Sequence, residues 1–210
     1  MADSVWLCDL LRNDAALFPF DWDPAFVDGE KMQSVIYRNE MGESLSAELF
    51  PKEIYAKDDQ NYDTKLRYDK MHNLVWAGIT LVSAVAANII RNFDLGQGAL
   101  YPIKVLAKDR QTPLRGEYFA WNFGNVKNCY LPDRSPRTNR NQYTASPRYY
   151  PPYPHLEGDV VLSANSFEQP DVWVDPIVAT TFFVHGNLAN ALVKAGMLND
   201  FDFKRCAIAD

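Results

Sequence analysis

The stretch "FFVHGNLANALVKAG", residues 182–196, holds the transition that decides the fold. It begins with strand-forming residues, and from Leu188 onward apolar residues recur with helical spacing. His185 stands at the junction, where the first backbone N–H groups of a helix need partners. Gly196 follows the last apolar turn, where glycine is favoured because the chain often turns left-handed after a helix. The stretch therefore predicts a strand that leads directly into a helix, with His185 as the helix cap.

A similar stretch, "LVSAVAANIIR", occupies residues 81–91, 102 positions earlier in the chain. Val82, Ala87, Asn88 and Ile90 align with Val184, Ala189, Asn190 and Leu192. Ser83 takes the position of His185 in this alignment and is expected to be an N-cap. A second strand-like run follows each copy, at residues 99–107 and 201–208. The sequence thus predicts two similar strand-helix-strand units, each helix burying one face on a sheet.

The longest apolar run, residues 74–90, reaches the lower limit of length for a membrane-spanning helix. Gly78, Thr80, Ser83 and Asn88 interrupt it, so it is better interpreted as a strand at 76–82 followed by a short helix from Ser83. No membrane span is expected.

Several other segments have the composition of strands. They are residues 5–10, 33–37, 116–124, 159–164, 171–176 and 179–184, and the third of these should pair with 99–107. The predicted fold class is α+β, with mixed or mostly antiparallel sheets and a few short helices. The chain forms either a single domain, 1–210, or two packed lobes, 1–125 and 126–210.

Charge and cysteine content limit the classes of function. The 210 residues carry a formal net charge of -6, which argues against direct nucleic-acid binding. The first residues lack the basic and apolar regions of a signal peptide. Cys8, Cys129 and Cys206 lie far apart and form neither a CxxC site nor a disulfide framework, so we expect a cytoplasmic protein.

Catalytic chemistry finds little support in the sequence. No GxSxG, HExxH or cysteine-histidine signature accompanies His185. His72 and His155 lack metal-ligand spacing, so we expect no metal and no cofactor, and a protein that is not an enzyme. The alternative is a small hydrolase that uses His185 with Asp171 or Asp175. A non-catalytic scaffold protein is a further alternative.

Two segments are candidates for a protein-binding surface. Residues 1–75 contain 15 acidic and 8 basic residues, and residues 128–158 contain six prolines, five tyrosines and four arginines. Tyrosine supplies contact area with little side-chain entropy to lose. The candidate binding residues are Asp21, Asp23, Asp28, Glu30, Asp58, Asp59, Tyr149, Tyr150 and Tyr153.

The C-terminal part resembles a bacterial family first catalogued as a domain of unknown function and now described as immunity proteins of polymorphic toxin and type VI secretion systems. The motifs are "GEYFAWNFGNV", "LPDRS" and "DVWVDPIVATTFFVHGNLANALVKAGMLNDFDF". The family shows an aspartate and serine pair at a strand end, a strand rich in Phe and Val, a Leu-x-x-Ala-Leu helix and an Ala-Gly-Leu segment before a last strand. Here these features fall on Asp133, Ser135, residues 182–184, Leu188, Ala191, Leu192 and residues 195–203.

The resemblance extends over residues 79–210 and departs from the family at the junction. The family commonly has serine at the position of His185 and a polar or acidic residue at that of Gly186. The resemblance implies a cytoplasmic immunity protein that binds a cognate toxin and blocks its active site or substrate face. A nuclease is one candidate toxin, because an acidic inhibitor could occupy its basic face as a substrate mimic.

Overall fold

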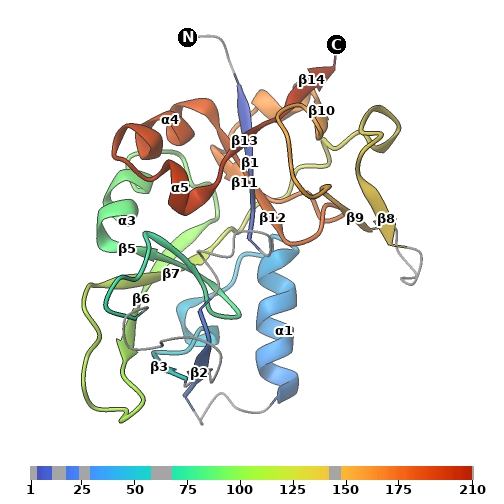
Figure 1. Ribbon diagram of the computed structural model, residues 1–210. Coiled ribbons are helices and arrows are strands. Elements are labelled where there is room, and N and C mark those ends of the chain that lie inside the picture. Colours follow the sequence, from blue (N-terminus) through green and yellow to red (C-terminus); the bar gives the residue numbers. More distant parts are fainter. Residues whose placement is uncertain (1–3, 11–17, 24–28, 58–67, 142–147, 210) are drawn as a thin grey trace.

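The computed structural model of the protein describes residues 4–10, 18–23, 29–57, 68–141 and 148–209 (Figure 1). Three of the candidate binding residues, Asp28, Asp58 and Asp59, lie outside these ranges. The α-helices are α1 (Gly29–Glu40), α3 (Ala84–Ile90), α4 (Gly186–Lys194) and α5 (Leu198–Phe201). The short 3-10 helices are η2 (Ala47–Leu49), η3 (Pro132–Arg134) and η4 (Ala164–Phe167).

The strands form two main sheets and two small pairs. The larger sheet has the order β2 (Phe20–Trp22), β3 (Glu53–Ala56), β6 (Ala99–Leu106), β7 (Tyr118–Asn122), β5 (Thr80–Ser83) and β4 (Leu74–Trp76). The four-stranded sheet has the order β11 (Val172–Trp173), β12 (Thr181–His185), β1 (Val5–Asp9) and β13 (Lys204–Arg205). The small pairs are β8 (Asn139–Asn141) with β9 (Arg148–Tyr150) and β10 (Val161–Ser163) with β14 (Ala207–Ala209).

The predicted α+β class is confirmed. Pairing is antiparallel except between β3 and β6 and between β10 and β14. β6 and β7 pair across a polar connection, as the sequence predicted. β1 belongs to the four-stranded sheet, whose other strands come from the C-terminal part, so a division of the chain at residue 125 does not separate the sheets.

The two sheets contain the same four-strand arrangement, which confirms the predicted pair of similar units. The order β4-β5-β7-β6 matches β11-β12-β1-β13, and all of these neighbours pair antiparallel. Ser83 lies opposite Tyr118 in β7, while the corresponding His185 lies opposite Val5 in β1. The N-terminal strand β1 therefore has the same position in the second unit as β7 has in the first.

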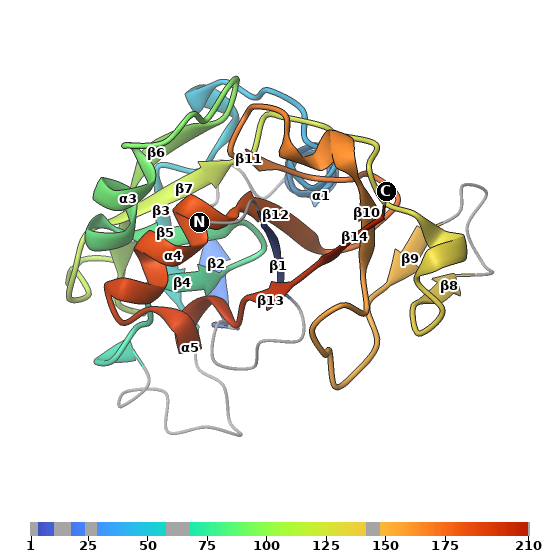
Figure 2. The same cartoon turned by 90° about the horizontal axis from the view of Figure 1, so that it is seen from above.

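The two helices of the repeat begin directly after β5 and β12 and pack against each other (Figures 1 and 2). The buried residues of α3 are Ala86, Ala87 and Ile90, and those of α4 include Leu188, Ala189 and Leu192, each 102 positions later. Small alanines at the contact allow the two helix backbones to approach closely. The aligned sequence positions are thus mainly packing positions.

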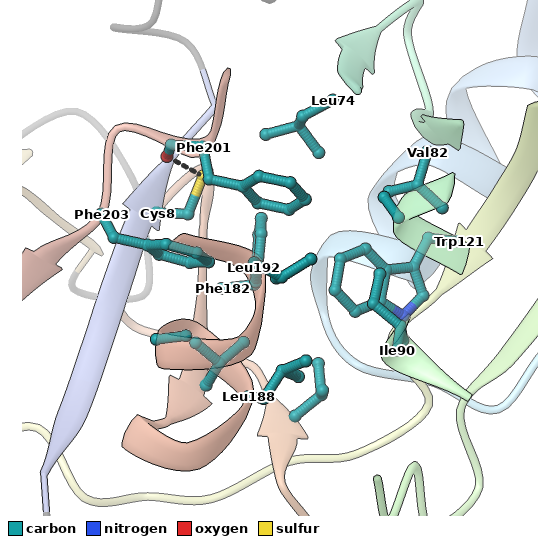
Figure 3. Close-up of a cluster of buried hydrophobic side chains, with 14 of the residues drawn as sticks. Cys8, Leu74, Val82, Ile90, Trp121, Phe182, Leu188, Leu192, Phe201 and Phe203 are labelled. Atoms are coloured by element: carbon teal, nitrogen blue, oxygen red, sulfur yellow. Dashed lines mark hydrogen bonds between the residues drawn. The ribbon is translucent and has the colours of Figure 1, made fainter. Parts of the chain in front are cut away.

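The main hydrophobic core lies between the two units (Figure 3). Side chains from the four-stranded sheet and α4, among them Phe182 and Leu192, face Val82 and Trp121 from the larger sheet. The ring centroid of Phe182 is 5.1 Å from that of Trp121 and 4.9 Å from that of Phe123. The Cys8 thiol donates to the Phe201 carbonyl at the edge of this core. Burial raises the Cys8 pKa well above its usual value, which suits a packing role.

Hydrogen bonds also join the two units at the core's edges. Asn73 precedes β4, and its backbone N–H and side-chain amide both donate to the Asp200 carboxylate, with His72 as a third contact. Burial acts to raise the pKa of Asp200, but these hydrogen bonds outweigh it and the net pKa is lowered. At the other edge, the Asp171 carboxylate accepts the Asp94 N–H, and the Asp171 N–H donates to the Asp94 carbonyl.

Some sequence-based assignments were wrong. Residues 33–37 lie within α1, where Met32, Val35 and Ile36 cover one helix face, so the run of β-branched residues misled the strand assignment. The expected strand at 76–82 is a hairpin of β4 and β5 that turns at Gly78 with φ +81°. Phe201 ends α5, and only the later part of 201–208 is extended. Asp133 lies in η3 and not at a strand end.

The repeat core predicts a large difference between two residues on the paired helices. Leu192→Ala should lower the free energy of unfolding by about 2–5 kcal/mol, because Leu192 is fully buried in the main core. Val85→Ala on α3 is the control and should change it by no more than about 0.5 kcal/mol, because Val85 is 60% exposed. Urea unfolding measures both, and equal effects would contradict the assignment of this core.

Candidate binding site

His185, the first candidate catalytic residue, is engaged by the protein itself. Its Nδ1 lies 2.8 Å from Asp171 Oδ1, and its Nε2 lies 2.9 Å from the backbone carbonyl oxygen of Ser166. Both neighbouring atoms are acceptors, so neither ring nitrogen faces a nucleophile. Ser166 is fully buried, and its hydroxyl is not the atom that meets the imidazole. The geometry is that of a histidine that holds two segments together.

Asp171, and not Asp175, is the carboxylate paired with His185. Asp175 accepts hydrogen bonds from the backbone N–H groups of Cys129, Tyr130 and Ile177. Its burial raises the pKa of the carboxyl group against the effect of these bonds. Asp175 therefore orients the chain around Cys129, and its described hydrogen bonds are to backbone N–H groups and not to His185.

His185 is the N-cap residue of α4 by position, but its side chain makes no capping hydrogen bond. The expectation that the imidazole caps the helix was wrong. Ser83, its counterpart, does cap α3: its hydroxyl accepts the Ala86 N–H at 3.2 Å and bonds to Asn73. In both units the backbone N–H of the cap residue donates to a backbone carbonyl. The acceptor of Ser83 is Asn73, just before β4, and the acceptor of His185 is Asp171, just before β11. The two units thus share this backbone hydrogen bond, while the side-chain contacts of the cap residue differ between them.

The segment that His185 contacts is also held by Lys127. Its ammonium group donates to the carbonyl oxygens of Ser166, Glu168 and Pro170 and lies 3.6 Å from the centre of the Trp173 ring. Burial lowers the pKa of Lys127 to about 8, while the carbonyl oxygens and the ring favour the charged form. His185 and Lys127 therefore both hold the segment 166–171 in place by hydrogen bonds.

Removal of the imidazole tests this structural role. His185→Ala should lower the free energy of unfolding by about 1–3 kcal/mol, because a buried Asp171 carboxylate loses a partner. The double variant His185→Ala/Asp171→Ala should lose less than the sum of the two single losses, because the two side chains interact. Urea unfolding of the four proteins gives the coupling energy, and strictly additive losses would contradict the pairing.

The described acidic candidates have different surroundings. Asp21 is exposed on β2 and lies 3.5 Å from the Lys57 ammonium group. Asp23 follows it and acts electrostatically on Tyr55, whose ring faces the Arg110 guanidinium. Glu30 is exposed in the first turn of α1. Positive side chains thus accompany Asp21 and Asp23, so these positions form a mixed surface.

The three candidate tyrosines differ in exposure. Tyr149 is half-buried on β9, with its ring 5.3 Å from that of Tyr130, and it bonds through its backbone to Ile177 and Ala179. Tyr150 is also half-buried and pairs with Asn139. Tyr153 is 70% exposed, the largest exposed fraction among the big apolar side chains of the described chain. Of the three, Tyr153 is the most exposed to solvent.

Tyr153 lies on a segment that we call the Tyr153 loop, residues 151–159, which projects between β9 and β10 (Figure 2). Leu156 on the same loop is 53% exposed. The nearly buried Asp159 carboxylate accepts from the Arg137 guanidinium at 2.8 Å and from the Leu156 N–H at 2.6 Å. Gly158 N–H donates to the Arg205 carbonyl at 2.8 Å. The loop therefore holds two apolar side chains in solvent on a fixed backbone.

His155 lies on the same loop, between Tyr153 and Leu156 in sequence, and is half-buried. Burial lowers its pKa to about 4, although the nearby Asp159 carboxylate acts in the opposite direction. The imidazole is therefore neutral at pH 7 and packs as an uncharged group. Leu156 and the Arg137–Asp159 pair were not among the candidates from the sequence, because their roles depend on contacts between separate segments.

The lowered pKa of His155 predicts a pH dependence of stability. An unfolded-state histidine has a pKa of about 6.5, so between pH 6.5 and 4 the unfolded chain binds more protons than the folded one. Stability should fall as the pH drops through this range. His155→Gln should remove that component, seen as a smaller loss of urea midpoint between pH 7 and pH 4.5. Equal losses in both proteins would contradict the burial of a neutral imidazole.

Other kinds of site find no support in the part of the chain that the structure describes. No group of three or more His, Cys, Asp or Glu side chains among those residues could hold a metal ion. No helix there is long and apolar enough to cross a membrane. The three cysteines are buried free thiols.

No family model matches this chain, and no curated protein shows a significant match. The resemblance to immunity proteins therefore stays a prediction.

Proposed function

We propose that this protein is an immunity protein, which binds a secreted toxin domain in the cytoplasm and neutralises it without catalysis of its own. The sequence motifs of residues 79–210 support the class, and the Tyr153 loop supports the binding surface. The observation that carries the proposal is the exposure of Tyr153 and Leu156, at 70% and 53%, on a loop fixed by the buried Asp159.

A fixed loop favours binding because less conformational entropy is lost on association. Side chains that must be ordered on binding each cost about 0.5–1.5 kcal/mol, and mobile loops cost more. Here the hydrogen bonds from Arg137, Leu156 and Gly158 hold the loop before any partner arrives. Exposed tyrosines in such positions are typical of residues that dominate binding energy. Tyr153 and Leu156 would insert into a pocket of the toxin and block its active site or substrate face.

The charge of the protein fits a basic partner. A net charge of -6 accelerates the approach of a positively charged toxin surface, such as the substrate face of a nuclease. The exposed Asp21 and Glu30 would contribute to this long-range attraction. Because Asp21 already has Lys57 as a partner, we assign the acidic residues to the rate of association and the Tyr153 loop to affinity.

The alternatives make different demands on the same molecule. A hydrolase would need a free ring nitrogen on His185, which both hydrogen bonds of the imidazole oppose. A scaffold protein would self-associate without a toxin, which size measurement of the purified protein reveals.

The decisive experiment pairs the chain with a candidate toxin domain, sought in the neighbouring reading frame. Tyr153→Ala/Leu156→Ala should weaken binding by at least about 100-fold, as expected for two residues worth about 2 kcal/mol each, and abolish protection of cells that express the toxin. Titration calorimetry and growth assays measure the two effects.

Tyr37→Ala is the matched control, because Tyr37 is 55% exposed on α1, outside the Tyr153 loop. It should keep both binding and protection. Thermal unfolding establishes that the variants fold. Full protection by folded Tyr153→Ala/Leu156→Ala, or an inability of the unchanged protein to bind the toxin, would overturn the proposal.

A further inference from the structure

A groove separate from the Tyr153 loop opens on the larger sheet. Its volume is about 740 Å³, within the range of about 300–1,000 Å³ that is usual for small-molecule sites. Phe50, Tyr101, Ile103, Val105, Leu114 and Tyr118 are among the residues that line it. All the lining residues belong to the described chain, between η2, β6 and the connection that leads to β7.

The groove lies along β6, where the strands on its two edges pair with different parts of it. Residues 99–103 of β6 pair with β7, and residues 104–106 pair with β3. Pro102, which has no N–H group, stands just before the part that pairs with β3. β3 and β7 lie on opposite edges of β6 and are staggered along it, and the connection that leads to β7 pairs with β6 at Leu106 and Pro113.

The walls of the groove are fixed. The Phe50 and Tyr101 rings lie 5.3 Å apart between centroids, and the Tyr101 hydroxyl donates to the Leu45 carbonyl at 2.7 Å. The Tyr118 hydroxyl donates to the His72 carbonyl, and burial raises the Tyr118 pKa to about 12. Both hydroxyl groups thus donate to backbone carbonyls of the protein, and the aromatic rings form an apolar wall of the groove.

The connection at residues 107–117 forms the other wall and is equally well held. The Asp109 carboxylate accepts the N–H groups of Gln111 and Thr112 and the Thr112 hydroxyl. Leu114 N–H donates to the Val105 carbonyl at 2.9 Å, which places Leu114 beside the sheet. The groove is therefore formed before any ligand binds.

The charged side chains at its mouth are unequally matched. Lys104 lies 3.2 Å from the Glu53 carboxylate, and Lys52 acts electrostatically on Glu48. Glu117 makes no ion pair among the residues that the structure describes, and its backbone carbonyl is fixed by the Ala84 N–H. Glu48 has Ser46 as a hydrogen-bond partner, so Glu117 is the carboxylate best placed to meet a positive group beside this aromatic, apolar cavity.

We propose that this groove binds a small cationic amphiphile, with an aromatic or aliphatic body against Phe50, Tyr101 and Leu114 and an ammonium group at Glu117. Aromatic faces and a carboxylate together recognise an organic ammonium ion. The phenol hydroxyls are engaged elsewhere, so the body of the ligand needs no hydrogen-bonding groups. The site lies outside the surface assigned to the toxin and does not depend on that proposal.

Three probes that share one body test the inference. They are 4-phenylbutylamine, 4-phenylbutanol and 4-phenylbutanoate, titrated into the full chain and followed by backbone amide shifts of Lys52, Leu114 and Glu117. Ligands of this size bind in the millimolar range or slightly tighter. The amine should bind about threefold to fivefold more tightly than the alcohol, as expected for an exposed ion pair, and the carboxylate should bind most weakly.

Two variants locate the site. Glu117→Gln should remove the preference for the amine while the alcohol still binds, and Glu157→Gln, an exposed carboxylate outside the groove, should leave it unchanged. Ala47→Trp places a large ring at the mouth, where Ala47 is exposed, and should abolish binding of all three probes while thermal stability and toxin protection persist.

Several results would overturn the inference. They are absence of binding by the amine, equal affinity for all three probes, a preference that survives Glu117→Gln, or binding unaffected by Ala47→Trp. Persistent protection by Ala47→Trp together with lost amine binding separates this site from the toxin surface.

Discussion

The structure depends on the contact between two apolar sheet faces that neither unit can bury alone. Phe182 from the four-stranded sheet packs against Trp121 and Phe123 from the larger sheet, with α3 and α4 beside them. Each unit is a small antiparallel sheet with one short helix, and such a unit has too little apolar area for independent stability. Joining the two faces gives one core, and it draws the N-terminal strand β1 into a sheet made mostly of C-terminal strands. The packing of the two sheets therefore also sets the positions of the Tyr153 loop and of the groove on the larger sheet.

The repeat shows which contacts the core requires and which the sequence was free to vary. Both units keep the backbone bond from the cap residue to the residue before the preceding strand. Both keep a small apolar face at the helix contact. The side chains at the junction differ: Ser83 with Asn73 in one unit, His185 with Asp171 in the other. A histidine at this position is therefore explained by its neighbours in the second unit, where it also holds the Ser166 carbonyl.

Local patterns in the sequence identified the repeat, and contacts between distant segments determined the rest. The strand-to-helix junctions, the Ser83 cap and the turn at Gly196 follow from nearest-neighbour chemistry, so they could be predicted. The helix α1 was missed because the adjacent β-branched residues Val35 and Ile36 favour a strand. The positions one helical turn away from them are mostly polar, so the helical period of apolar residues is weak. Tyr153 was a candidate from composition, whereas Leu156 gains importance only when Asp159 and Arg137 fix the loop. The groove could not be predicted, since its lining comes from η2, β6 and the connection to β7, which only the tertiary structure brings together.

Rigidity is distributed in this molecule so that exposed apolar groups stand on well-held backbone. The Tyr153 loop is fixed by a nearly buried carboxylate, and the groove wall is fixed by the Asp109 turn. An exposed tyrosine on a mobile loop would collapse onto the surface or lose its binding energy to ordering. On a fixed loop it stays in solvent, which costs the free protein some hydrophobic free energy but leaves that free energy available to a partner. The same reasoning separates the two sites: a projecting pair of side chains suits insertion into another protein, whereas a concave aromatic wall suits a ligand that enters it.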